Sequence, residues 1–343
     1  MNFNFSTYRL NSDDTLESVA DKLGITAENL KRYHNTYCDL NNLIGNSLKG
    51  ISEIIIPPEE KIEEYKSTNS ILNQKQNLPS RYLTSDFYAT NYDVREIIKQ
   101  TDQDDIEISY RINLTVKDSD DKGFIIESKT SNFLKNNNIP DDKISAISIA
   151  CMDSIYPITL SVPKQGKIKS IFNHDVLLKK FENKKSDLED FFIGEINKKY
   201  IDTFHNTLKD ENFLLKQISS SLLYQSLFLK TEWLHNSKTW DDYFYITPNS
   251  FPVLCHLNTE YSFENPNLVQ IIIKGTVDEK STLQEVLKGV KTTEQYDDFI
   301  QGEITLKYTT SKDNKQLKQL FAEIIIYHEG KTYKQHNVTV TSK

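Results

Sequence analysis

Residues 106–116 read IEISYRINLTV, and apolar and polar side chains alternate along them. Successive side chains of a β-strand point to opposite faces of a sheet, so this stretch predicts a strand with one buried face and one wet face. Residues 118–123 supply a turn, and residues 123–127 return as a partner strand. The stretch therefore predicts an antiparallel hairpin.

The same pattern recurs on both sides of a helical stretch. A second hairpin is expected where residues 156–162 and 167–171 flank a turn. From 175 to about 230 the apolar spacing changes to three, four and seven, which predicts a helical block. Strand patterns return at 268–273, 302–308, 321–328 and 332–341, the last three as an antiparallel meander. This order predicts an α+β fold, and its pattern is similar to lipoprotein-carrier and START-like folds.

The first 58 residues have a different organisation. A short strand around Tyr8 leads into an amphipathic helix that ends at Gly24, a typical residue for a helix C-terminus. Thr26 opens a second helix as its N-cap. Residues 53–56 then form a strand that Pro57 stops. The expected order is strand, helix, helix, strand.

This segment resembles the LysM family, whose modules have the βααβ fold and typically bind N-acetylglucosamine-containing glycans in a shallow groove. The resemblance is carried by Tyr8, Asp14-Thr15-Leu16, Val19-Ala20, Gly24, Leu30, Asn35, Gly45, Leu48 and Ile56-Pro57. Two features depart from the family pattern. Asp13 stands where the family usually has Gly, and residues 49–53 add length before the last strand.

The resemblance implies a glycan groove between the first turn and the loop before the second strand. One wall would contain Asp13, Asp14 and Thr15, and the other Leu40, Asn41, Asn42, Leu43 and Ile44. Backbone groups and Asn side chains would bind acetamido groups above an apolar floor. Asp14 and Thr15 are equally suited to be helix caps without any ligand.

A chain of 343 residues is long enough for two or three domains. A LysM module over 1–58 and a polar linker over 59–84 precede an α+β domain over 85–232. Residues 233–343 form a mainly antiparallel region, either separate from that domain or continuous with it. The aromatic side chains between 233 and 263 favour core packing or a protein interface, with Trp233, Trp240, Tyr243 and Tyr245 as interface candidates.

The sequence contains no GxSxG, Walker A, GxGxxG or HExxH motif, each of which would indicate a known catalytic or nucleotide-binding site. Its seven His are isolated, so we expect no metal ligands and no cofactor. Cys255 and His256 are adjacent, but neighbours in a strand point to opposite faces and cannot act on one another. The interpretation is a non-enzymatic binding protein without catalytic residues.

Composition bears on partners and compartment. The net charge of -8, with basic residues scattered, argues against nucleic-acid binding. No 18-residue apolar run predicts a membrane span, and the first residues lack a secretory signal pattern. The three cysteines are far apart, which fits a reducing compartment. We therefore expect a cytoplasmic protein.

Three functional hypotheses follow. The first is a cytoplasmic adaptor that binds another protein, because LysM modules without a signal resemble those in bacterial contractile injection systems such as type VI secretion. Its partner would be a machine component or an effector that it loads. The second is an exported peptidoglycan- or GlcNAc-glycan-binding protein. The third is a carrier that holds an apolar ligand between sheet and helix.

Overall fold

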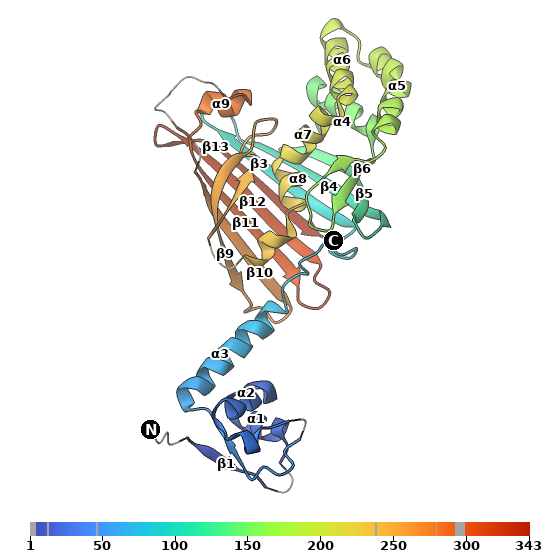
Figure 1. Ribbon diagram of the computed structural model, residues 1–343. Coiled ribbons are helices and arrows are strands. Elements are labelled where there is room, and N and C mark those ends of the chain that lie inside the picture. The colour runs from blue at the N-terminus through green and yellow to red at the C-terminus, as the bar shows by residue number, and fades with distance from the viewer. Residues whose placement is uncertain (1–4, 12–13, 46, 237–238, 279, 292–298) are drawn as a thin grey trace. The chain divides into compact units, whose positions relative to one another are not determined.

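The computed structural model describes residues 5–11, 14–45, 47–236, 239–278, 280–291 and 299–343, the side chains of 68–73 excepted. The chain divides into two compact units, Met1–Asn77 and Leu78–Lys343. Helix α3 (Glu59–Lys75) occupies most of the stretch expected to be a linker and belongs to the first unit (Figure 1). The second unit begins inside that stretch.

The first unit has the expected order of strand, helix, helix and strand. Its elements before α3 are β1 (Thr7–Arg9), α1 (Leu16–Leu23), α2 (Ala27–Tyr37), the short 3-10 helix η1 (Leu40–Asn42) and β2 (Glu53–Ile55). The two strands pair antiparallel, with Tyr8 opposite Ile54. Val19, Leu30 and Ile54 are among the fully buried core residues. The LysM resemblance itself stays a prediction.

Local signals fix both ends of α1. The Thr15 side chain accepts a hydrogen bond from the Ser18 amide at 3.1 Å, and the Ser18 hydroxyl accepts one from the Thr15 amide at 3.0 Å. This reciprocal pair satisfies amides that the first helical turn leaves without partners. Gly24 ends the helix in the left-handed conformation, with φ 68°.

The second unit is built on one antiparallel sheet, which has 11 strands among the described residues. Their spatial order is β7-β6-β5-β4-β3-β13-β12-β11-β10-β9-β8. The strands are β3 (Asn91–Gln100), β4 (Ile106–Ser119), β5 (Gly123–Lys135), β6 (Ile158–Pro163), β7 (Ser170–Ile171), β8 (Trp240–Phe244), β9 (Val253–Ser262), β10 (Leu268–Val277), β11 (Gln301–Ser311), β12 (Leu317–His328) and β13 (Lys331–Ser342).

Helices interrupt the run of strands. They are α4 (Lys143–Ile155), α5 (His174–Phe191), α6 (Glu195–Lys209), α7 (Glu211–Ser220), α8 (Leu222–Leu227), the 3-10 helix η2 (Thr231–His235) and α9 (Leu283–Lys288). The predictions of a helical block near 175–230 and of a mainly antiparallel sheet are confirmed. The hairpin β4–β5 and the meander β11–β12–β13 also pair as expected.

Helix α8 packs on one face of this sheet, which we call the inner face. It contacts β12 and β13, and it lies across the sheet in Figure 1. The hydroxyl of the buried Tyr308 donates to the carbonyl of Ser226 at 2.9 Å. Pairing places Tyr308 opposite Leu320, and both are fully buried. The inner face is therefore the unit's core.

Strands from both sides of residue 232 belong to the same sheet, because β3 pairs antiparallel with β13. β3, β8, α4 and α9 were not predicted from the sequence, and of β9 only the pair Cys255-His256 was placed in a strand. In β3 the alternation is obscured by Glu96, which lies on the inner face and is bound there by Tyr110 and by His336. Asp142 caps the start of helix α4, because its side chain accepts a hydrogen bond from the Ser145 amide at 2.8 Å. The helix itself is rich in β-branched Ile, which is more typical of strands, so its sequence did not indicate a helix.

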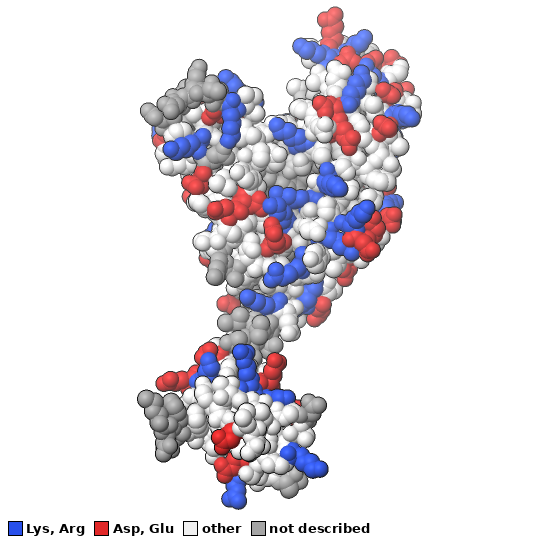
Figure 2. Space-filling model, viewed as in Figure 1, with Lys and Arg blue, Asp and Glu red and all other residues white. Residues whose placement is uncertain are grey.

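The surface carries both signs of charge. Figure 2 shows Lys and Arg interspersed with Asp and Glu over the face of the second unit that it draws. Among the described residues, no helix has both the length and the apolar character needed to cross a membrane.

Candidate functional site

The first unit contains a hollow of about 490 Å³ between the start of α1 and the loop before β2. Residues 14–17 form one side. Lys31 and four residues of the loop form the other, namely Ile44, Gly45, Ser47 and Leu48. The hollow thus combines apolar side chains with two carboxylates, an ammonium and hydroxyl groups.

Helix α2 fixes the loop wall of the hollow. The Asn35 side chain accepts from the Ile44 amide at 2.8 Å and donates to the Ile44 carbonyl at 3.0 Å. Lys31 donates to the Gly45 carbonyl at 2.6 Å. The buried His34 bonds to the Asn42 carbonyl at 2.8 Å and accepts from the Ile55 amide at 2.9 Å. The loop is therefore held before any ligand arrives, which lowers the entropic cost of binding.

The opposite wall is held by Asp14. Its carboxylate accepts from the Asn11 amide at 2.9 Å, from Lys22 at 2.9 Å and from the Tyr8 hydroxyl at 3.2 Å. The Asn11 amide, followed by Lys22, lowers the pKa of Asp14 to about 2. Asp14 is thus ionised at neutral pH and fastens the turn before α1 to β1.

The hollow contains some of the residues predicted for the glycan groove and lacks others. Asp14, Thr15 and Ile44 line the hollow as expected, and Asp13 lies outside the described residues. Leu40, Asn41, Asn42 and Leu43 are not among the lining residues, and Leu40 is 85% exposed. The reason is local, because residues 40–42 form η1 and His34 binds its last carbonyl. The wall expected from them is built instead by Gly45, Ser47 and Leu48.

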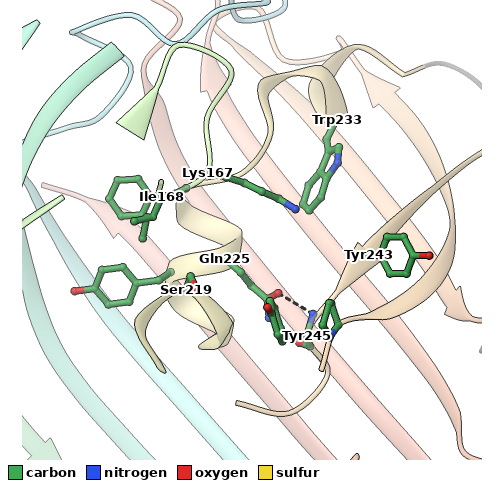
Figure 3. Close-up of a pocket in the computed structure, with 10 residues that line it drawn as sticks. Lys167, Ile168, Ser219, Gln225, Trp233, Tyr243 and Tyr245 are labelled. Atoms are coloured by element: carbon green, nitrogen blue, oxygen red, sulfur yellow. Dashed lines mark hydrogen bonds between the residues drawn. The ribbon is translucent and has the colours of Figure 1, made fainter. Parts of the chain in front are cut away.

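A second pocket, of about 260 Å³, lies in the second unit. Aromatic side chains form much of its lining, and Lys167 is its one charged lining residue among those described. Figure 3 shows Lys167 extending toward the ring of Trp233, with Gln225 and Tyr245 nearby. The Lys167 ammonium lies 5.2 Å from the centroid of that ring. The full lining is Lys167, Ile168, Ser219, Tyr224, Gln225, Phe228, Trp233, Tyr243, Tyr245 and Pro252.

Buried hydrogen bonds hold the pocket's walls. Gln225 of α8 accepts from the Tyr245 amide at 3.1 Å and donates to the Tyr245 carbonyl at 2.7 Å. Asp242 of β8, whose side chain is 10% exposed, accepts from Lys230 at 2.6 Å and from the Trp233 indole at 2.7 Å. Burial by itself would raise the pKa of Asp242, but these bonds outweigh it and lower the pKa.

The four predicted interface residues gather around this pocket. Trp233, Tyr243 and Tyr245 line it, and Trp240 packs against Trp233 with ring centroids 5.7 Å apart. Trp233 is only 1% exposed, because its ring fills the space beside Asp242 and Phe244. Trp233 therefore forms a wall of the pocket and is too buried to make the surface contact expected of it. Tyr243 is exposed, and its hydroxyl points away from Lys167 in Figure 3.

Sequence reasoning missed Lys167 and Gln225, which line this pocket, and Asp242, which binds the Trp233 wall. Lys167 follows directly on the predicted turn 163–166, but nothing local marks it as a lining residue. Its place depends on contact with residues 228–230, about sixty positions further along the chain. In the first unit, Asn35 was identified as a position of the LysM pattern, but its hydrogen bonds to the Ile44 backbone were not predicted.

Among the described residues of the second unit, Cys151, Cys255 and His256 do not form a reactive pair. Burial raises the pKa of Cys151 to about 11 and that of Cys255 to about 12, so both remain thiols at neutral pH. His256 is exposed on the other face of β9, beside Asp241 and Asp278, as alternation predicted. The described residues contain no group of three or more His, Cys, Asp or Glu placed to hold a metal.

Comparisons with known proteins identify no family. No family model matches the chain, and no curated protein matches it. A solved structure of lipovitellin, described as showing lipid-protein interactions, is similar with a TM-score of 0.38 and 9% identity. The match covers 74% of this chain and 24% of that one, so this chain corresponds to about a quarter of the lipovitellin chain. A likeness at this level carries no argument about fold or function.

Replacing the buried carboxylate tests the electrostatics of the second pocket. Asp242→Asn should lower the free energy of unfolding of the second unit by about 1.5–3 kcal/mol at pH 7, because charge-assisted bonds are lost. The native pKa of Asp242 lies below its unfolded value. Its contribution is therefore complete above pH ~4 and is lost as the pH falls through the native pKa. The difference in free energy of unfolding between the wild type and Asp242→Asn should therefore shrink as the pH falls.

Urea unfolding followed by Trp fluorescence provides the measurement, since both Trp residues lie in the second unit. Asp241→Asn is the matched control, because Asp241 lies on the same strand and, among the described residues, pairs with the exposed His256; it should have little effect. Equal effects of the two substitutions at pH 7 would contradict this account of Asp242.

Proposed function

We propose that the first unit is a LysM module that binds a glycan containing N-acetylglucosamine. The observation that carries this proposal is the position of the hollow between the first turn and the loop before β2. The LysM resemblance implies a glycan groove at the same place. The strand pairing of β1 with β2 also supports it.

The lining of the hollow suits a sugar. Pyranose rings have apolar C–H faces and a rim of hydroxyls, so they need apolar contacts together with hydrogen-bonding groups. Leu16, Ile44 and Leu48 supply the apolar surface, and Glu17 and Ser47 supply acceptors and a donor. Asp14 and Thr15 hold the wall through the bonds described above. A shallow single site of this kind gives affinities in the micromolar to millimolar range, about -8 to -4 kcal/mol.

A side chain added at the wall of the hollow should weaken this binding. Gly45 lines the hollow, and an added Cβ there would meet no atom within 4 Å, so Gly45→Val adds a branched side chain at a position with room for its first carbon. We expect the wild type to bind chitin tetramer or pentamer in calorimetry, and Gly45→Val to lose at least tenfold in affinity. The full-length protein is used for each titration.

Asn41→Ala is the matched control, because Asn41 belongs to the predicted wall but not to the hollow. It should bind as the wild type does. Loss of binding in Asn41→Ala with normal binding in Gly45→Val would restore the wall expected from the sequence. An absence of binding at millimolar oligosaccharide would contradict the glycan proposal and leave the module as a protein-docking element.

A second candidate function is an adaptor that binds another protein, such as a component or an effector of a contractile injection system. It is favoured by the turn between α5 and α6, where Phe191, Ile193 and Ile196 are 79%, 77% and 85% exposed. Three large apolar side chains exposed so close together are typical of an interaction site. The contact is therefore proposed at this turn, in place of the aromatic stretch 233–263.

Removing these side chains tests the adaptor proposal. The triple substitution Phe191→Ser, Ile193→Ser and Ile196→Ser should prevent recovery of spike, tube or effector proteins in a pull-down from the native cell. Leu287→Ser with Val290→Ser, which removes exposed apolar side chains elsewhere in the unit, is the control and should retain the partner. Recovery of the same proteins by the triple variant would exclude this turn as the contact.

A further inference from the structure

The pocket lined by Lys167 contains a positive charge that no carboxylate of the described residues contacts. Among the described residues, no Asp or Glu oxygen lies within 4.0 Å of the Lys167 ammonium, which faces the Trp233 ring instead. Burial lowers the pKa of Lys167, although Asp242 opposes this effect at longer range. A half-buried ammonium without an ion pair is costly, and a bound anion would remove that cost.

The acid that acts on Lys167 at longer range, Asp242, is already engaged. One oxygen of Asp242 accepts from Lys230 at 2.6 Å and from the Trp233 indole at 2.7 Å, and the other accepts from the Tyr243 amide at 2.7 Å. Lys230 therefore balances the charge of Asp242 directly. Gln225 is also occupied, since both ends of its amide bind the Tyr245 backbone. Lys167 is the charged group that the pocket leaves available.

The backbone holds Lys167 in this position at a cost. Its φ of 58° lies in the left-handed region, which disfavours side chains with a Cβ. The Lys167 amide donates to the Phe228 carbonyl at 3.2 Å. Gly166, with φ 81°, packs so closely that a Cβ there would lie 1.8 Å from the Leu229 carbonyl oxygen. Such strain persists where the surrounding structure fixes it, and it is common at binding sites.

We propose that this pocket binds a small organic anion, a carboxylate carried on an apolar ring or short chain, with Lys167 as its counter-ion. Aromatic walls from Tyr224, Phe228, Trp233 and Tyr245 would contact the apolar body. The volume of about 260 Å³ is below that of pockets for drug-sized ligands and limits the body to roughly one or two rings. This site is separate from the glycan hollow, and its occupancy does not depend on the glycan proposal.

Three carboxylates test the proposal in the full-length protein: phenylacetate, indole-3-acetate and octanoate. Each is compared with its neutral amide by calorimetry and by saturation-transfer NMR. We expect at least one carboxylate to bind, and its amide to bind at least tenfold more weakly. Lys167→Met, which keeps an apolar stem but removes the charge, should lose at least tenfold in affinity for the carboxylate.

Lys307→Met is the matched control, because the Lys307 ammonium also faces an aromatic ring, 5.4 Å from the centroid of Phe321, but lies outside the pocket. It should bind as the wild type does. Lys167→Arg keeps the charge and should retain binding within a few-fold, which separates loss of charge from misfolding. Equal binding of acid and amide, unchanged binding in Lys167→Met, or no binding by any of the three carboxylates at millimolar concentration would overturn the proposal.

Discussion

The second unit depends on covering the inner face of a broad antiparallel sheet. A sheet with one apolar face must bury it against another element, and the short helix α8 does this at the centre. The last carbonyls of a helix lack partners within the helix. Two buried tyrosines supply those partners, since Tyr308 donates to Ser226 at 2.9 Å and Tyr88 donates to Leu227 at 3.2 Å. Helix and sheet are thereby joined by packing and by hydrogen bonds between buried groups.

The candidate anion pocket follows from this joint. Once α8 is fixed, the residues after it are fixed too, and Gly166 fits against the carbonyl of Leu229. That contact brings Lys167 next to the chain at Phe228 and in front of Trp233. From the same helix, Gln225 holds Tyr245 in place. The pocket is therefore made of segments distant in sequence that share α8 as their support.

The sequence predicted features that depend on local periodicity and failed where distant contacts decide. The alternation at 106–116 correctly indicated β4, because each inner side chain there is apolar or aromatic. β3 was not predicted because the charged Glu96 occupies an inner position. Its carboxylate is stabilised there by a hydrogen bond to His336, 240 residues away. In the first unit, the sequence indicated the caps of α1 at Thr15 and Gly24. Residues 40–43, predicted as a groove wall, do not line the hollow, because the His34 contact that holds η1 cannot be inferred from spacing.

Native-state hydrogen exchange of the full chain measures the joint between α8 and the sheet most directly. If α8 is part of the core, its amides and those of β11 and β12 should exchange through one opening with a shared free energy, close to that of global unfolding of the unit. Exchange of α8 at a much lower free energy than β11 and β12 would contradict this account, since the pocket would then lack a fixed wall.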